Sequence, residues 1–131
     1  MKRAGFTMIE LIFVIVILGI LSAVALPKFI GVSTQAKAGK CKAMVGTLNR
    51  TTLPALWSEA MLDDGNVTSA DFNATAISAQ IEIPSECGTA TTIANAIAGT
   101  QQTVTIDGTD YKIDLNNTLG SSASPKLRWH K

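Results

Sequence analysis

A single carboxylate, Glu10, lies in an otherwise uncharged and mostly apolar stretch from Phe6 to Leu26. A charged side chain at the centre of a membrane helix costs ~2.5–3.5 kcal/mol, so a carboxylate in such a stretch needs a partner. Cleavage of the peptide bond between Gly5 and Phe6 would supply one, because the new amine of Phe6 would lie one helical turn from Glu10. The same amine could reach the Glu10 of an adjacent copy. Neutralising both charges would then fix the axial offset between two copies.

A second candidate chemistry is attachment of sugar to asparagine. Four Asn-x-Thr triplets begin at Asn49, Asn66, Asn73 and Asn116. Three of them have an aspartate two positions earlier, at Asp64, Asp71 and Asp114. This spacing resembles the extended acceptor sequence of bacterial N-linked oligosaccharyltransferases. Asn66, Asn73 and Asn116 are therefore candidate N-glycosylation acceptors, although aspartate is also a common turn residue.

Catalysis is not indicated. His130 is the only histidine, and no nucleophile and base occur in a recognisable combination. Asp107, Asp110 and Asp114 are near enough in sequence to suggest calcium, but their spacing lacks the ligand pattern of a known loop. A polar hairpin face is the preferred interpretation. We predict no enzymatic activity, no metal site and no cofactor.

The C-terminal tail is basic and aromatic, with Lys126, Arg128, Trp129, His130 and Lys131. It could contact nucleic acid or a neighbouring subunit, and it could equally be a packed or frayed chain end. The net charge of the chain is only +1, which argues against a dedicated nucleic-acid binder. We expect protein and lipid partners rather than nucleic acid.

The elements that must position Glu10 begin with a membrane segment. The 21 residues from Phe6 to Leu26 are long enough for a bilayer core, which needs ~20 residues of helix. Lys2 and Arg3 precede them, so we expect a cytoplasmic N-terminus and a chain exported after Pro27. The alternative is a secretory signal cleaved near Ala23–Ala25, which leaves Glu10 unexplained.

A helical pattern of apolar residues continues from Phe29 to Met61, and Asp63-Asp64-Gly65-Asn66 is a strong stop signal. Pro54 either kinks this helix or marks a separate helix that starts at Thr51 or Thr52. The predicted organisation is a leader at 1–5, a transmembrane and assembly helix at 6–27, an amphipathic stem helix at 28–62 and a β-rich head at 63–131.

The head is predicted to be mostly sheet, with one short helix capped by Ser69 or Asp71 and ending at Ala79. Residues 80–83 alternate polar and apolar side chains before Pro84, as a strand does. Residues 103–106 and 111–115 flank Asp107-Gly108-Thr109-Asp110 and predict a hairpin. The side chains expected to face the stem are Val104, Ile106, Tyr111, Ile113 and Leu115. The fold class is α+β, with a long N-terminal helix packed on a small antiparallel sheet.

Cys41 and Cys87 both lie in the part expected to be exported, where disulfides persist. One bridge would join the stem to the head and would remove unfolded-state entropy worth ~4 kcal/mol. We predict this disulfide, with two free buried thiols as the alternative.

Charge is unevenly distributed along the chain. The region from Lys28 to Arg50 is basic, and the region from Thr51 to Leu115 is mainly acidic. Staggered copies could attract one another through these regions, or both could simply be solvated faces.

The stretch Gly5-Phe6-Thr7-Met8-Ile9-Glu10-Leu11, followed by an apolar run and Pro27, resembles the class III leader of type IV pilins and type II secretion pseudopilins. The resemblance implies that a prepilin peptidase cuts after Gly5 and methylates the Phe6 amine. It also implies that Glu10 and Pro27 serve assembly, and that the helix can unwind between Gly19 and Pro27. Many family pilins carry their cysteine pair near the C-terminus, a pattern from which Cys41 and Cys87 depart.

The resemblance further implies a filament subunit for adhesion, motility or uptake. Its partners would be copies of itself, the peptidase, the inner-membrane assembly platform and, before assembly, membrane lipid. The expected location is the bacterial inner membrane with a periplasmic head, and then an extracellular pilus or a periplasmic pseudopilus. A pseudopilin of a secretion or DNA-uptake system is the alternative. A signal-anchored envelope domain, which would keep residues 1–5, is a third interpretation.

Overall fold

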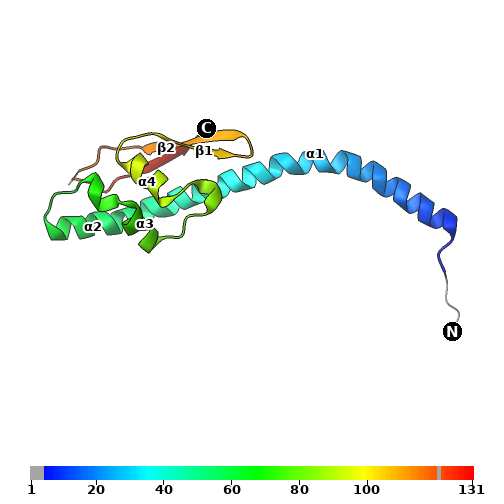
Figure 1. The fold of residues 1–131 in the computed structure, drawn as a ribbon, viewed down its shortest axis with the longest axis horizontal. Coiled ribbons are helices and arrows are strands. Elements are labelled where there is room, and N and C mark those ends of the chain that lie inside the picture. Colours follow the sequence, from blue (N-terminus) through cyan, green and yellow to red (C-terminus); the bar gives the residue numbers. More distant parts are fainter. Residues whose placement is uncertain (1–4, 121) are drawn as a thin grey trace. The chain divides into compact units, whose positions relative to one another are not determined.

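The computed structural model describes residues 5–120 and 122–131, which fall into two compact units. The N-terminal unit ends at Gln35, and the head unit comprises Ala36–Lys131. Figure 1 shows the elements of both units. The structure confirms an α+β fold with a long N-terminal helix and a small antiparallel sheet.

The longest element is helix α1, which spans Met8–Thr47 and contains Pro27. Its composition is rich in Leu, Ile, Ala and Val, of which Leu and Ala are strong helix formers. The main-chain N–H of Glu10 donates to the side-chain oxygen of Thr7 over 3.3 Å, so Thr7 satisfies one of the unpaired donors of the first turn. The helix continues past Pro27 in this structure.

The expected disturbance at Pro54 takes the form of a wider helical turn. A π-helix, Leu48–Thr52, follows α1, and helix α2 then runs over Leu53–Asp63. The N–H of Leu53 bonds the carbonyl of Leu48, while Pro54 falls in the first turn of α2, where its missing N–H costs least. The backbone therefore stays helical through this proline, and α2 is a separate element whose N-cap position is Thr52, close to the start that one of the two alternatives gave. The stop signal is confirmed, since α2 ends at Asp63 and Gly65 has φ +71°.

The middle of the head unit is more helical than expected. Its elements are the 3-10 turn Ser69–Phe72, helix α3 (Ala74–Gln80), the 3-10 turn Ser85–Cys87 and helix α4 (Ala90–Ile97). The expected caps Ser69 and Asp71 were wrong as N-caps, because Thr68 and Asn73 hold those positions. Helix α4, which the sequence analysis missed, starts with a capping box between Thr89 and Thr92.

The strand expected at residues 80–83 is not formed. Ile81 has an extended backbone, with φ −150° and ψ 139°, but no strand among the described residues pairs with it. Ile81 and Ile83 instead pack half-buried against the core. Alternation therefore predicted the burial of these two side chains but not a partner for their main chain.

The sheet has strands β1 (Gln102–Ile106), β2 (Thr109–Leu115) and β3 (Leu127–His130) in the order β1-β2-β3, all antiparallel. The hairpin is confirmed: Ile106 pairs with Thr109 around a two-residue turn in which Asp107 and Gly108 have φ +47° and +80°. Val104, Ile106 and Ile113 are buried as expected, and Tyr111 and Leu115 are half-buried.

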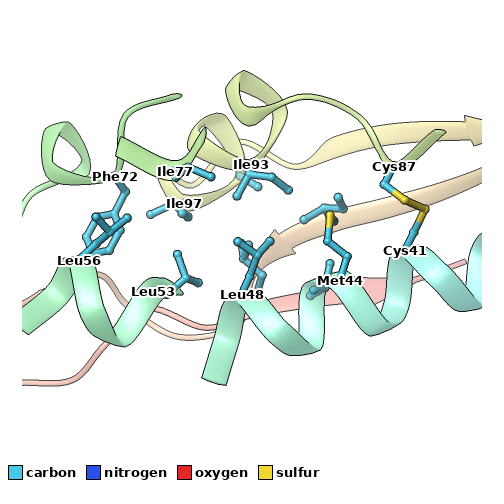
Figure 2. Packing of buried hydrophobic residues seen from close by; sticks show 14 of the residues in the cluster. Cys41, Met44, Leu48, Leu53, Leu56, Phe72, Ile77, Cys87, Ile93 and Ile97 are labelled. Carbon is cyan, nitrogen blue, oxygen red and sulfur yellow. A yellow bond between two sulfur atoms is a disulfide. The ribbon is translucent and has the colours of Figure 1, made fainter. Parts of the chain in front are cut away.

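One hydrophobic core holds the head unit together. Figure 2 shows Met44 of α1, Leu48 of the π-helix, and Leu53 and Leu56 of α2 facing a layer above them. That layer contains Phe72, Ile77, Ile93 and Ile97, and the Cys41–Cys87 bond closes one end. Because the last turns of α1 supply part of this core, the head unit includes them.

Candidate functional site

The candidate processing site lies just before the first helical turn. Gly5, Phe6 and Thr7 are non-helical, and the side chain of Phe6 is 85% exposed. Phe6 is thus not one helical turn from Glu10, because the helix begins at Met8. The peptide bond between Gly5 and Phe6 is in an open segment that a peptidase could bind. Residues 1–4 of the predicted leader lie outside the described residues.

Sequence reasoning missed the part that Thr7 plays here. Thr7-Met8-Ile9-Glu10 has the spacing of a capping box, and that pattern was a usable signal. With Thr7 as the cap, Glu10 falls in the first turn, where the helix dipole favours a negative charge. The capping bond of Thr7 therefore lies at the start of the helix, and the candidate cleavage site between Gly5 and Phe6 precedes it.

The N-terminal unit exposes apolar side chains all round its helix. Phe13, Leu18 and Val24 are 68%, 55% and 68% exposed, and the most apolar 18-residue window of this helix is not buried at all. Its mean hydropathy of 2.9 suits a membrane span by length and composition. Such a surface must be covered by lipid or by protein.

Glu10 is the only ionisable side chain between Phe6 and Pro27. Among the described residues it has no ion-pair partner, whereas the hydroxyl of Ser22 donates to the carbonyl of Leu18 over 2.7 Å. The apolar segment therefore satisfies its polar serine internally, whereas the carboxylate of Glu10 has no such partner among the described residues.

Cys41 and Cys87 form a disulfide in the head unit, with Cα atoms 5.2 Å apart and both residues fully buried. The bond joins α1 to the 3-10 turn Ser85–Cys87, near one end of the core (Figure 2). It closes a loop over a separation of 46 positions.

Two lysines of the basic region pair with the acidic region of the same chain. Lys37 Nζ lies 2.8 Å from Asp107 Oδ1, and Lys40 Nζ lies 2.8 Å from Glu86 Oε1. The hydrogen bond from Lys40 lowers the pKa of the Glu86 carboxyl below its ordinary value. Two basic residues are thus paired with acidic residues of their own head unit rather than with those of a neighbouring copy.

The three aspartates considered for calcium point to different partners. Asp107 pairs with Lys37, and Asp110 accepts a 2.6 Å hydrogen bond from the hydroxyl of Thr105. Asp114 is held by Arg128, whose Nη2 and Nε lie 2.8 Å and 3.1 Å from its two oxygens. The hydrogen bond from Arg128 lowers the pKa of Asp114 and raises that of Arg128. These contacts match the preferred polar hairpin face.

The C-terminal tail is built into the sheet. Leu127–His130 form β3, Trp129 stacks on Tyr111 with ring centroids 5.2 Å apart, and Arg128 is bound by Asp114. The tail is therefore a packed chain end, one of the alternatives that the sequence left open.

The remaining candidate residues are the asparagines. Asn66, Asn73 and Asn116 are exposed, whereas Asn49 is half-buried and bonded to β3. They occupy four separate places in the head unit, and the structure does not bring them together.

Comparison with known proteins agrees with this N-terminal arrangement. The prokaryotic N-terminal methylation motif matches residues 1–26, which contain Gly5, Phe6 and Glu10. This motif and the similarity described next show that the N-terminal segment resembles that of a type IV pilin. The chain is similar to the type IV narrow pilus major component PilA5 of Thermus thermophilus, with 56% identity over 36 residues.

That similarity spans 28% of this chain and 31% of the Thermus protein. No solved structure gives a significant match. The comparisons therefore bear on the N-terminal segment most directly, and the head unit is interpreted from its own residues.

Proposed function

We propose that this chain is a structural subunit that is cut between Gly5 and Phe6, methylated on the Phe6 amine and polymerised into a helical filament. The observation that carries the proposal is the methylation motif over residues 1–26. Its described part contains an exposed apolar helix whose one carboxylate, Glu10, has no ion-pair partner among the described residues. A carboxylate buried in apolar surroundings is stabilised when a positive group pairs with it. The amine of Phe6 is the group that cleavage creates.

Before assembly, the inner membrane covers the apolar helix and the head faces the periplasm. During assembly, neighbouring copies replace the lipid, and Glu10 of one copy pairs with the Phe6 amine of the next. This exchange buries the side chains that are open in the single chain, such as Phe13 and Leu18. Pro27 and Gly19 are the positions at which α1 can unwind to suit the packing.

The partners of this proposal are copies of the same chain, a prepilin peptidase, an inner-membrane assembly platform and membrane lipid. The Thermus relative is described as the major component of a narrow type IV pilus, which favours a surface filament for adhesion, motility or uptake. The alternative is a pseudopilin of a type II secretion or DNA-uptake system, which would use the same N-terminal segment.

Mass spectrometry of intact protein tests the proposal. Filaments are sheared from the native cells, and both the sheared material and the envelope are analysed. An abundant chain that begins at methylated Phe6 in the sheared filaments supports the surface pilus. A processed chain confined to the envelope supports the pseudopilin. A chain that keeps residues 1–5 contradicts both.

A further inference from the structure

We propose that Asn66 carries an N-linked oligosaccharide, and that the structure favours it over the other three Asn-x-Thr triplets. The sugar would be added on the exported side of the membrane, so this inference relies on the membrane orientation given under the proposed function. It goes beyond that function because neither cleavage nor polymerisation requires a sugar.

Asn66 lies in the loop between α2, which ends at Asp63, and the 3-10 turn that starts at Ser69 (Figure 1). Its side chain is exposed, and among the described residues its amide forms no hydrogen bond. The preceding Gly65 has φ +71°, a conformation suited to glycine, and it lies just after the end of α2. The acceptor nitrogen is thus open to solvent.

The aspartate two positions before this triplet, Asp64, lies in the same loop. Asp64 Oδ1 accepts a 2.9 Å hydrogen bond from the main-chain N–H of Asn66. This is a local turn contact, and Asp64 itself is exposed and has no ion-pair partner among the described residues. A transferase could therefore bind the carboxylate without first breaking a tertiary contact.

The other side of the acceptor sequence needs a small rearrangement. Thr68 is the N-cap of the 3-10 turn, where its N–H and its hydroxyl donate to Asp71 Oδ2 over 2.7 Å and 3.1 Å in a local capping box. Val67 is buried, so binding of an extended peptide must lift that one side chain from the core. Local opening of a loop requires far less free energy than global unfolding.

Asn49 is the opposite case. Its Nδ2 donates to the carbonyl of Leu127 over 2.8 Å, and its Oδ1 accepts from the N–H of Leu127 over 2.7 Å. A sugar on Nδ2 would have to lie between the helix and β3. Asn49 also lacks the acidic residue, because Thr47 stands two positions earlier. It is therefore a natural negative control.

The Asn73 triplet is tied to the fold through Asn73 itself and through Phe72, which precedes it. Asn73 Oδ1 caps α3 through the N–H of Ala76, and its Nδ2 donates to the carbonyl of Ala70 over 3.0 Å. Phe72, between the aspartate and the asparagine, is fully buried. Presenting this triplet in extended form would remove Phe72 from the core, a change that costs several kcal/mol.

Asn116 is exposed, but its main chain is hydrogen-bonded and the two residues before it lie in the β-sheet. Its N–H donates to the carbonyl of Lys126 over 2.7 Å, and the aspartate of its triplet, Asp114, is held by Arg128. The residue between them, Leu115, pairs with Leu127 in the sheet. Modification here would require β2 and β3 to separate, so Asn116 ranks below Asn66.

The reaction is a transfer from a polyprenyl-diphosphate-linked oligosaccharide. A bond forms between Nδ2 of Asn66 and the anomeric carbon of the first sugar, and the bond from that carbon to the phosphate oxygen breaks. The polyprenyl diphosphate leaves with the electron pair, and the amide proton passes to a basic carboxylate of the transferase. A head tethered to the membrane by α1 would be close to such a lipid-linked donor.

The test uses the chain purified from its native cells, reduced and cleaved on the N-terminal side of aspartate. This cleavage places Asn66 in peptide 64–70, Asn73 in 71–106 and Asn116 in 114–131, as the aspartate positions require. Asn49 falls in the peptide that ends at Leu62. We expect an oligosaccharide mass on peptide 64–70.

Three variants sharpen the test. Asn66→Gln should remove the sugar. Asp64→Asn should reduce its occupancy at least about tenfold, a factor that corresponds to ~1.4 kcal/mol, and this occupancy is read on peptide 63–70 because the variant loses the cleavage site at position 64. Asn73→Gln should leave the occupancy of Asn66 unchanged. An unmodified peptide 64–70, or a sugar on the Asn49 peptide, would overturn the inference. The same digest contains a peptide that begins at Phe6 if the leader has been removed. Leader processing, on which the proposed function depends, is therefore measured independently of glycosylation.

Discussion

The side-chain amide of Asn49 forms two hydrogen bonds with the main chain of Leu127, one to its carbonyl over 2.8 Å and one from its N–H over 2.7 Å. These bonds span 78 positions and attach β3 to the π-helical turn that follows α1. Asn49 thereby acts as a substitute for a neighbouring strand at the start of β3.

Replacing Asn49 with alanine should lower the free energy of unfolding by ~1–3 kcal/mol, because the N–H and carbonyl of the buried Leu127 would lose their partners. Chemical denaturation of the full chain in detergent, followed by circular dichroism, measures this change. Asn95→Ala is the control, because Asn95 is an exposed residue of α4. Equal stability of the two variants would show that the two hydrogen bonds of Asn49 contribute little to the free energy of unfolding.

This contact also shows what the sequence could not predict. Asn49 was visible as the start of an Asn-x-Thr triplet, but its real partner depends on how a distant strand packs. Strand β3 was missed for a related reason, because its four residues include Arg128 and His130 and resemble a charged tail. Its pairing with β2 and the packing of Leu127 decide its conformation.

The features that were predictable depend on local signals. The hairpin followed from Asp107-Gly108, whose positive φ values suit a two-residue turn. The N-terminal helix followed from its apolar composition alone. Helix α4 has an equally local signal in its capping box at Thr89, and the Thr-rich composition of the head concealed it. The alternation at residues 80–83 failed because a strand also needs a partner.

The disulfide gives a second stability prediction. Replacing both Cys41 and Cys87 with alanine should lower the free energy of unfolding by ~4 kcal/mol, since the bridge closes a loop over 46 positions. Denaturation of the wild-type chain with and without reductant measures the contribution of the bond itself. The double variant should not respond to reductant. A wild-type chain that is equally stable in both conditions would contradict the prediction.

The ion pair between Asp114 and Arg128 predicts a dependence on pH. The hydrogen bond from Arg128 lowers the pKa of Asp114 below its ordinary value of 3.8. A group with a lowered pKa in the folded state stabilises that state above its ordinary pKa. The stabilisation is lost as the pH falls from about 3.8 through the lower folded value.

Asp114→Asn should therefore be less stable than the wild type at pH 7, and the difference should shrink as the pH falls below about 3.8. Thermal denaturation at a series of pH values in detergent measures it. His130, whose Nδ1 lies 3.9 Å from Asp114, and Gln101 also face this carboxylate and remain unchanged in the variant. Asp63→Asn controls for the loss of one charge. A difference that does not vary with pH would refute this account.

Gly5 offers a test of leader processing. A Cβ atom added at Gly5 would meet no other atom within 4 Å among the described residues, so the chain itself tolerates a side chain there. Gly5→Leu should nevertheless reduce cleavage at least about tenfold, or ~1.4 kcal/mol, if the peptidase site admits only glycine. Gly39→Leu is the matched control, because Gly39 is equally open. Intact mass of membrane-extracted protein measures the processed fraction, and a fully processed Gly5→Leu chain would refute the leader assignment.

Glu10 gives the prediction that bears most directly on assembly. Glu10→Ala and Glu10→Gln should leave membrane insertion and processing intact, because removing a charge from an apolar helix favours insertion. Both variants should reduce the yield of sheared filaments at least about tenfold, since the Phe6 amine of each neighbouring copy would be buried without a counter-charge. Glu59→Ala on α2 controls for the loss of an exposed carboxylate.

The two Glu10 variants separate the effect of charge from that of side-chain shape, because glutamine keeps the length of the side chain. Normal filament yield from Glu10→Gln would show that charge pairing does not drive assembly, whereas loss in both variants with normal processing would localise the defect to the contact between copies.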